Sequence, residues 1–326
     1  MPIGRPPILC FDIETLPDPK AIRATHLSAA ADDHTAIEEA KAAQRERTGS
    51  DFLPIPCQKV LVASCVLRTR EGLQVLSLED VDGAGEAKVV QDFFGLIDQH
   101  VPQLVSWNGA GFDLPVFNLR AMVHGVAAPT YWDLGGGDKE FKWNNYQSRY
   151  HTRHLDVMDA LAMHNNRASA KLDVMARLCG FPGKVGGVDG SQVYDTWRAG
   201  QQEIVRKYCE TDVMNTYLLY LRFLQITGSL SPEAYDEEMQ VVVDTLDGLY
   251  RADPQGASHW DEFLTAWVGP PKETPAEQVQ PEQVQPEQVS EPASEACEDL
   301  PPAPAAVPSL APQSSNSASA EPANAG

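Results

Sequence analysis

The first hydrophobic run of the chain is nearly continuous and ends in acidic residues. The segment Pro7–Thr15 reads PILCFDIET, and apolar side chains run without interruption from Ile8 to Phe11. An unbroken apolar run of this length is typical of a strand that is buried on both faces of a sheet. The pattern therefore predicts a central strand whose carboxyl end carries Asp12 and Glu14.

The segments that follow alternate between strand and helix patterns. Strand patterns occur in Lys59–Arg68, Gly72–Leu78 and Gln103–Trp107, and a tight turn joins the first two as a hairpin. This succession predicts an α/β fold, with a mixed sheet that carries helices on its faces. Helical periodicity occurs in Gly85–His100, Phe112–Val123, Leu155–Met163, Lys171–Leu178, Gln201–Ile226, Pro232–Tyr250 and Trp260–Trp267.

Three stretches interrupt this alternation. Leu16–Gln58 separates the first two strands, and its Ala- and Glu-rich middle, His34–Arg47, favours a helix. An insertion of this length beside a strand end is often a lid or a substrate-facing loop. Tyr131–His154 is rich in Gly, Trp and Asn and predicts an irregular segment, and Phe181–Gly190 predicts a glycine-rich loop.

The last part of the chain differs in composition from the rest. Residues 270–326 hold 12 of the 25 prolines and no aromatic residue, and the units AEQVQ, PEQVQ and PEQVS follow one another from Ala276 to Ser290. Such a segment cannot bury enough apolar surface to offset the entropy of ordering. We therefore expect a folded domain over residues 1–269, with a core at about 7–227. A disordered tail that could dock a protein partner follows over residues 270–326.

The chain is acidic, with a formal net charge of −21. Nine acidic residues against Lys272 place about −8 in the tail, which leaves about −13 for the folded part. An acidic domain argues against broad electrostatic binding of duplex nucleic acid, because such binding requires a basic face. A nuclease is not excluded, since metal ions neutralise part of an acidic site and a short groove can carry a local basic patch.

No stretch of the sequence has the hydropathy of a membrane span. The opening MPIGRPP lacks the apolar core of a signal peptide, and a run of about 18 apolar residues does not occur. We therefore expect a cytoplasmic protein without a membrane partner. The six cysteines form no CxxC pair, and we expect them to be buried, reduced thiols.

Two of the element ends carry candidate catalytic carboxylates. Asp12 and Glu14 are two residues apart on a strand, so both side chains point to the same face. Neighbouring carboxylates repel each other unless cations bind there; a solvated strand end is the alternative. Asp113 falls in the first turn of a predicted helix, behind Asn108 and two glycines. Asp113 there could instead cap the helix or complement its dipole, and Asn108 could be a turn residue.

A third pair of candidate residues lies in the long predicted helix. Tyr208 and Asp212 are four residues apart and therefore share one helix face. That face is otherwise apolar, so Asp212 requires a partner. Tyr208 as an aromatic residue of the core is the alternative. Each of the three motifs is weak alone, and their conjunction in this order is the stronger signal.

The three motifs together resemble those of the DnaQ-like (DEDD) 3′–5′ exonuclease superfamily on the ribonuclease H-like fold, which implies a mixed five-stranded sheet flanked by helices. The motifs are FDIET at residues 11–15, N-x-x-x-F-D at 108–113 and Y-x-x-x-D at 208–212, whose tyrosine marks one subclass. FLPIPCQKV, RYHTRHLDVMDAL and GKVGGVDGSQV are similar to stretches of stand-alone bacterial proteins related to the proofreading domain of family-B DNA polymerases.

This resemblance implies an enzyme that removes nucleotides from the 3′ end of single-stranded nucleic acid, DNA or RNA, and releases nucleoside 5′-monophosphates. Two Mg²⁺ or Mn²⁺ ions would be held by four carboxylates, with Asp12 bridging the ions. Tyr208 would orient the attacking water. The implied metal ligands are Asp12, Glu14, Asp113 and Asp212. A non-catalytic nucleic-acid-binding or scaffold module on the same fold is the alternative, and the presence of all five functional side chains argues against it.

Substrate contacts implied by the resemblance are less specific. Phe112 could stack on a base of the substrate, or it could be a core aromatic residue behind Asp113. The basic cluster at residues 149–154 could contact backbone phosphates, or it could be a solvated loop. We favour helix capping or local salt bridges for Asp156 and Asp159. Lys184 lacks the GxxxxGK[ST] context of a phosphate loop, so nucleoside triphosphate binding is not expected. The candidate substrate residues are Thr15, Asn108, Phe112, Arg149, Arg153 and His154.

Overall fold

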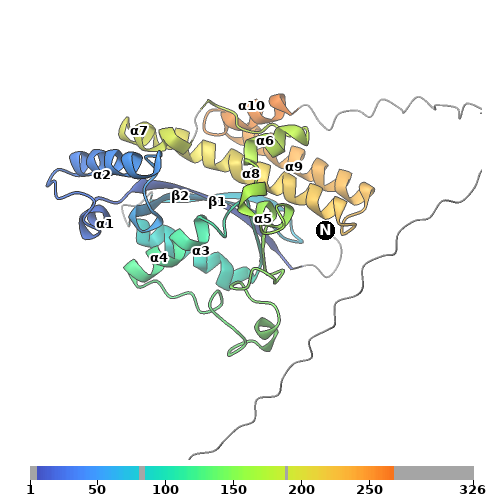
Figure 1. Cartoon of the computed structure of the whole chain (residues 1–326). Helices are drawn as coiled ribbons and strands as arrows, with labels where there is room; N and C mark the ends of the chain where they lie inside the picture. Colours follow the sequence, from blue (N-terminus) through green and yellow to red (C-terminus); the bar gives the residue numbers. More distant parts are fainter. Residues whose placement is uncertain (1–5, 81–84, 188–189, 268–326) are drawn as a thin grey trace, which may run out of the picture. The chain divides into compact units, whose positions relative to one another are not determined.

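The computed structural model describes residues 6–80, 85–187 and 190–267 (Figure 1). Its strands form one sheet in the order β3-β2-β1-β4-β5. β1, β2 and β3 are antiparallel neighbours, whereas β4 runs parallel to β1 and β5 parallel to β4. This arrangement confirms the predicted α/β fold with a mixed five-stranded sheet. The strands are β1 (Ile8–Pro17), β2 (Gln58–Arg68), β3 (Leu73–Glu79), β4 (Gln103–Ser106) and β5 (His154–Asp156).

Helices cover both faces of this sheet, with α3 and α4 on one side and α8 and α9 on the other (Figure 1). The helices are α1 (Pro19–Ala24), α2 (Asp33–Thr48), α3 (Glu86–His100), α4 (Asp113–His124), α5 (Val157–Leu161), α6 (Leu172–Leu178), α7 (Val193–Arg198), α8 (Gln202–Ile226), α9 (Pro232–Ala252) and α10 (Ser258–Ala266). Short 3-10 turns occupy Ile55–Cys57, Lys139–Lys142, Asn166–Ala168 and Gly190–Gln192.

The central strand β1 contributes alternate side chains to two hydrophobic cores. Cys10 packs in the core beneath α8, together with Tyr217. Phe11 points to the opposite face and packs with Phe93 of α3 and Phe117 of α4, whose rings stack with their centroids 3.8 Å apart. The period-two alternation of a strand explains this division, and it fixes which face every later β1 side chain reaches.

Some element boundaries differ from the predicted ones. β1 continues to Pro17, two residues past the predicted end, after a β-bulge between Glu14 and Thr15. The predicted helix Leu155–Met163 begins instead as the strand β5, in which His154 pairs with Leu104. A three-residue strand is too short to show a period of its own, so its pairing with β4 decides the conformation. Tyr131–His154 is otherwise irregular, as predicted, apart from one 3-10 turn.

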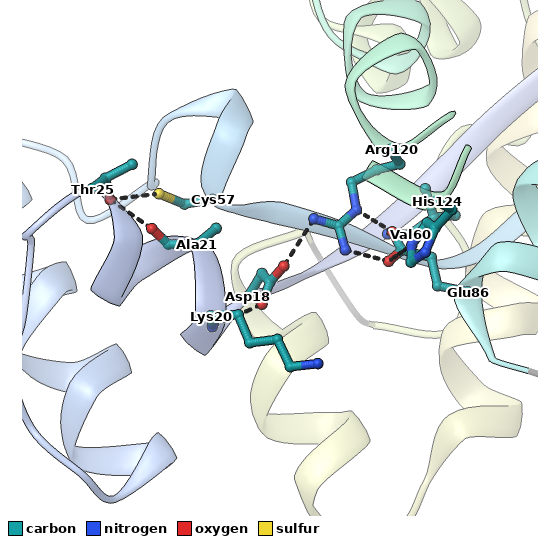
Figure 2. Close-up of polar contacts among 9 residues, drawn as sticks. All are labelled: Asp18, Lys20, Ala21, Thr25, Cys57, Val60, Glu86, Arg120 and His124. Atoms are coloured by element: carbon teal, nitrogen blue, oxygen red, sulfur yellow. Dashed lines mark hydrogen bonds and ion pairs between the residues drawn. The ribbon is translucent and has the colours of Figure 1, made fainter. Parts of the chain in front are cut away.

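A buried ion network ties the insertion between β1 and β2 to the helices on the other side of the sheet (Figure 2). Arg120 of α4 donates from Nη1 to Asp18 Oδ2 at 2.8 Å and from Nε to Glu86 Oε1 at 2.7 Å. Glu86 also accepts the Val60 N–H at 2.7 Å and contacts His124 Nε2 at 2.8 Å. The base of the insertion is therefore anchored at Asp18, while the predicted lid or substrate-facing role stays a prediction.

Two further expectations concern the chain as a whole. The disordered tail predicted for residues 270–326 lies outside the described residues. Within the described part of the chain, no helix combines the length and apolarity that a bilayer span requires. The described cysteines are free thiols, and all of them except the half-buried Cys179 are buried.

Candidate active site

β1 and α8 bring three carboxylates together on one face of the sheet. Asp12 and Glu14 continue the β1 face that contacts α8, and Asp212 faces them from that helix. One oxygen of each carboxylate lies within 4.8 Å of the others, close enough for all three to bind one metal ion. Glu14 is 9% exposed and Asp212 is 6% exposed, so the acidic cluster is largely shielded from solvent.

The electrostatics of this cluster oppose ionisation in the protein alone. Burial raises the pKa of Asp12 well above its usual value, and repulsion from Asp113, Glu14 and Asp212 raises it further. The pKa of Glu14 is raised for the same reasons, burial first and Asp212 second. Burial also raises the pKa of Asp212 to about 6. Such carboxylates are stabilised in their charged form by a bound cation.

The residues present fit a hard divalent cation. All the donor atoms of the cluster are carboxylate oxygens, the ligands that Mg²⁺ and Mn²⁺ prefer. Asp212 Oδ1 is buried and has no hydrogen-bond partner among the described residues. A buried carboxylate oxygen without a partner is costly, and a metal ion would supply the missing contact.

Asp113 lies beside this cluster and is held by the backbone of β1. Its Oδ1 accepts the N–H of Ile13 at 3.1 Å, and the side chain is 4% exposed. Burial raises the pKa of Asp113 to about 7. The bond to Ile13, the residue that follows Asp12, holds Asp113 next to β1, and repulsion from Asp113 adds to the raised pKa of Asp12. The structure therefore brings Asp113 to the site as a neighbour of Asp12, outside the group of three whose oxygens converge.

The loop that delivers Asp113 is shaped by Asp156, a residue whose role in this loop was not predicted. Asp156 accepts the Asn108 N–H with Oδ1 and the Ala110 N–H with Oδ2, both at 3.0 Å. Asn108 adopts a left-handed conformation with φ 68°. A Cβ on Gly109 would lie 2.5 Å from Ser106 Cβ, so only glycine fits there. Asp156 also caps α5, as predicted, and a capping pattern alone does not reveal its second task.

Tyr208 and Lys184 complete the neighbourhood of Asp212. The Tyr208 side chain is 5% exposed and packs in a hydrophobic cluster, in agreement with its alternative role as a core aromatic residue. Its hydroxyl accepts a hydrogen bond from the ammonium group of Lys184. Lys184 Nζ lies 4.0 Å from Asp212 Oδ2 and 4.8 Å from the centroid of the Tyr208 ring. Asn215 of α8 holds the loop that carries Lys184. Its Oδ1 accepts the Gly183 N–H at 3.1 Å, and its Nδ2 donates to the Gly183 carbonyl at 2.8 Å.

Three predicted substrate residues lie near the carboxylates. Thr15 and Asn108 belong to the two segments that carry Asp12 and Asp113, and the Thr15 hydroxyl donates to Gln58 Oε1 at 3.0 Å. Phe112 directly precedes Asp113, and its ring packs against Phe52 with the centroids 5.5 Å apart. Phe52 is 55% exposed, so this pair presents an aromatic edge to solvent. Contacts of these residues with a substrate stay predictions.

The other three predicted substrate residues are not brought to the carboxylates. Arg149 pairs with Asp159 at 2.7 Å, and Arg153 lies 4.6 Å from the centroid of the Phe141 ring. His154 is buried, and its Nε2 lies 2.9 Å from Ser106 Oγ. Burial lowers the pKa of His154 to about 4, so the ring is neutral near neutral pH and does not offer a charge to a phosphate.

Most of the described chain is similar to a known protein family. Residues 50–267 match the model of a family described as "Predicted 3'-5' exonuclease related to the exonuclease domain of PolB". The match includes the motifs with Asp113 and Asp212 and begins after Asp12 and Glu14.

Two DNA polymerases are similar to part of this chain. A DNA polymerase of Archaeoglobus fulgidus is 24% identical over 195 residues, which are 55% of this chain and 24% of the polymerase. The family B DNA polymerase of the hyperthermophilic archaeon Pyrobaculum calidifontis is 18% identical with a TM-score of 0.41, over 68% of this chain and 25% of that polymerase. The chain thus matches about a quarter of the length of either relative. Since the family match spans more than half of its residues, the chain belongs to the family of predicted 3′–5′ exonucleases related to the exonuclease domain of PolB.

Proposed function

We propose that this protein is a metal-dependent 3′–5′ exonuclease that hydrolyses the terminal phosphodiester bond of single-stranded nucleic acid. DNA is the favoured substrate, RNA is the second, and the product is a nucleoside 5′-monophosphate. The observation that carries the proposal is the convergence of Asp12, Glu14 and Asp212 from β1 and α8, with oxygens within 4.8 Å of one another. Family membership of the chain supports the same reaction.

The proposed cofactors are two Mg²⁺ or Mn²⁺ ions at this cluster. Asp12, Glu14 and Asp212 would hold them, with the carboxylate of Asp113 as a further candidate ligand. When bound, such ions lower the pKa of a water molecule and stabilise the charge of the leaving oxygen. The low exposure of Glu14, Asp113 and Asp212 excludes bulk water from the surroundings, which strengthens each electrostatic contact within the site.

Tyr208 would position the attacking water rather than take its proton. Burial raises the pKa of Tyr208 well above its usual value, and the nearby Asp212 and Glu14 raise it further. The phenol therefore keeps its proton at neutral pH and serves as a hydrogen-bonding group. Lys184 donates a hydrogen bond to the Tyr208 hydroxyl, and this contact would orient the phenol before substrate binds.

A digestion experiment with purified protein tests this proposal. Single-stranded DNA and RNA oligonucleotides labelled at the 5′ end would be incubated with Mg²⁺ or with EDTA, beside the same oligonucleotides with a blocked 3′ end. We expect ladders that shorten from the 3′ end, nucleoside 5′-monophosphate as product, and no reaction with EDTA or a blocked end. Metal-independent cleavage, or internal cuts in blocked strands, would contradict the proposal.

A further inference from the structure

A large hollow lies at the opposite end of the sheet from the carboxylates. Its volume is about 1270 Å³. Pro7, just before β1, and Gln103, the first residue of β4, border it on the side of the sheet. The end of α8, from Tyr220 to Thr227, borders it as well. Pockets for small ligands measure about 300–1,000 Å³. The size and the open shape of this hollow therefore suit a segment of a polymer better than a single small molecule.

The rim of this hollow is basic in a protein whose net charge is −21. Three arginines and three histidines border it, against the carboxylates of Glu71 and Glu140. Arg149 and His164 both pair with Asp159, and Arg153 lies 3.9 Å from Glu140. Arg70 forms no ion pair with another described residue, and His151 accepts the Asn145 N–H with Nδ1 at 3.0 Å, which leaves its Nε2 for another contact. The basic residues are Arg70, His100, Arg149, His151, Arg153 and His164.

An exposed aromatic ring stands on the same rim. Tyr150 is 80% exposed, and its ring meets that of His164 edge to face, with the centroids 5.7 Å apart. Apolar side chains, among them Leu155 and Phe223, also line the hollow. Basic side chains that share a groove with an accessible aromatic ring are features by which proteins bind single-stranded nucleic acid, with phosphates on the cations and bases on the ring.

The hollow is within reach of a strand whose 3′ end lies at the carboxylates. Along α8, eight residues separate Asp212 from Tyr220, a span of about 12 Å at roughly 1.5 Å per residue. The helix α5 connects the two places directly. Asp156 at its start holds the Asn108–Ala110 loop, and Ala160 near its end lines the hollow.

We infer that this hollow is a second binding surface for single-stranded nucleic acid, which holds upstream nucleotides of the strand that is degraded from its 3′ end. The inference rests on the proposed exonuclease activity for its substrate class. It assigns Arg70 and His151 to phosphates and Tyr150 to a base, and it separates this surface from the contacts of the terminal nucleotide at the carboxylates.

The test compares long and short substrates in a double variant, Arg70→Glu with Tyr150→Ala. The measured quantity is the ratio of kcat/KM for an oligonucleotide of about 20 nucleotides to that for a dinucleotide, whose single internucleotide step is shorter than the roughly 12 Å between the two places. We expect the ratio to fall about tenfold or more, since one stacked base and one phosphate contact are lost. The matched control is Arg251→Glu, an exposed arginine on α9 that does not border the hollow.

Binding without hydrolysis gives a second readout. Fluorescence anisotropy of a labelled strand in EDTA should show a dissociation constant about tenfold higher for the double variant, and a weaker dependence on salt. An unchanged substrate ratio together with unchanged anisotropy would overturn the inference, even with an active wild-type enzyme. A wild-type protein that hydrolyses neither substrate would overturn the proposed function instead, while the anisotropy would still test the hollow.

Discussion

Lys184 Nζ lies 4.0 Å from Asp212 Oδ2 and donates a hydrogen bond to the Tyr208 hydroxyl, so a cation of the protein itself faces the acidic cluster. Its charge lowers the pKa of Glu14 and of Asp212, against the larger effect of burial. Lys184 thus offsets part of the repulsion among the carboxylates, and it holds the phenol that we assign to the attacking water.

Replacement of this lysine should separate turnover from metal binding. We expect Lys184→Met to reduce kcat by up to about a hundredfold, because the Tyr208 hydroxyl loses its hydrogen-bond partner. The apparent affinity for Mn²⁺ should not fall, because the variant removes a positive charge that competes with the ion. Steady-state rates across a Mn²⁺ titration measure both quantities. Weaker metal binding at unchanged kcat would show that Lys184 does not act through Tyr208.

Tyr208 and Asp212, one helical turn apart in α8, should respond differently to substitution. Tyr208→Phe removes only the hydroxyl and should lower kcat by up to about 10²–10⁴-fold, the range of positioned catalytic groups, with Mn²⁺ affinity retained. Asp212→Ala deletes a proposed ligand and should also weaken Mn²⁺ binding. Full activity of Tyr208→Phe would make Tyr208 a packing residue only.

The acidic cluster should make stability depend on both pH and metal. Burial raises the pKa of Asp113 to about 7 and that of Asp212 to about 6. A carboxyl group whose pKa is raised by folding destabilises the fold as it ionises, so the metal-free protein should lose stability from about pH 4 to about pH 7. If Mg²⁺ occupies the cluster as proposed, it favours the ionised form, so the rise in Tm that it produces should grow over the same window.

Thermal melts at several pH values, with Mg²⁺ and with EDTA, measure this coupling. The variant Asp12→Asn is the control, because it removes one negative charge from the cluster and should flatten the pH dependence in EDTA. A Tm shift from Mg²⁺ that is equally large at about pH 5 and about pH 8 would contradict the raised pKa values.

Arg120 should be essential for stability rather than for catalysis. Its side chain is 7% exposed and pairs with the equally buried carboxylates of Asp18 and Glu86. Arg120→Met would remove the guanidinium that neutralises both buried carboxylates, and breaking a buried ion pair typically costs about 3–5 kcal/mol of unfolding free energy. The exposed ion pair of Lys88 with Asp92 provides the control, since Lys88→Met should cost less than about 1 kcal/mol. Equal losses in urea denaturation would mean that the buried network contributes little.

Local sequence patterns were sufficient for the longer strands and helices of this fold and for parts of the site. Period two alone places Asp12 and Glu14 on one face of β1, and the spacing of four residues alone places Tyr208 and Asp212 on one face of α8. Their meeting across some 200 residues depends on packing that no local pattern contains, and the resemblance to a known superfamily supplied it.

The features that were not predicted depend on long-range contacts. Lys184 reaches the carboxylates because Asn215 holds the backbone of Gly183, a contact between a loop without periodicity and a distant helix. Asp156 belongs to a strand of three residues that exists only through its pairing with β4. The burial of His154 follows from the same pairing, so His154 does not join Arg149, His151 and Arg153 at the rim of the hollow.

The central claim is that the acidic cluster carries out metal-dependent hydrolysis, and the rate of Asp12→Ala tests it most directly. Single-turnover digestion of a 5′-labelled single strand would be followed over a wide range of Mg²⁺ and Mn²⁺ concentrations, with circular dichroism and melting in EDTA as controls for folding. We expect no hydrolysis at any metal concentration, together with a metal-free Tm at least as high as that of the wild type, because repulsion within the cluster is relieved. A folded Asp12→Ala variant with the turnover of the wild type would contradict the account.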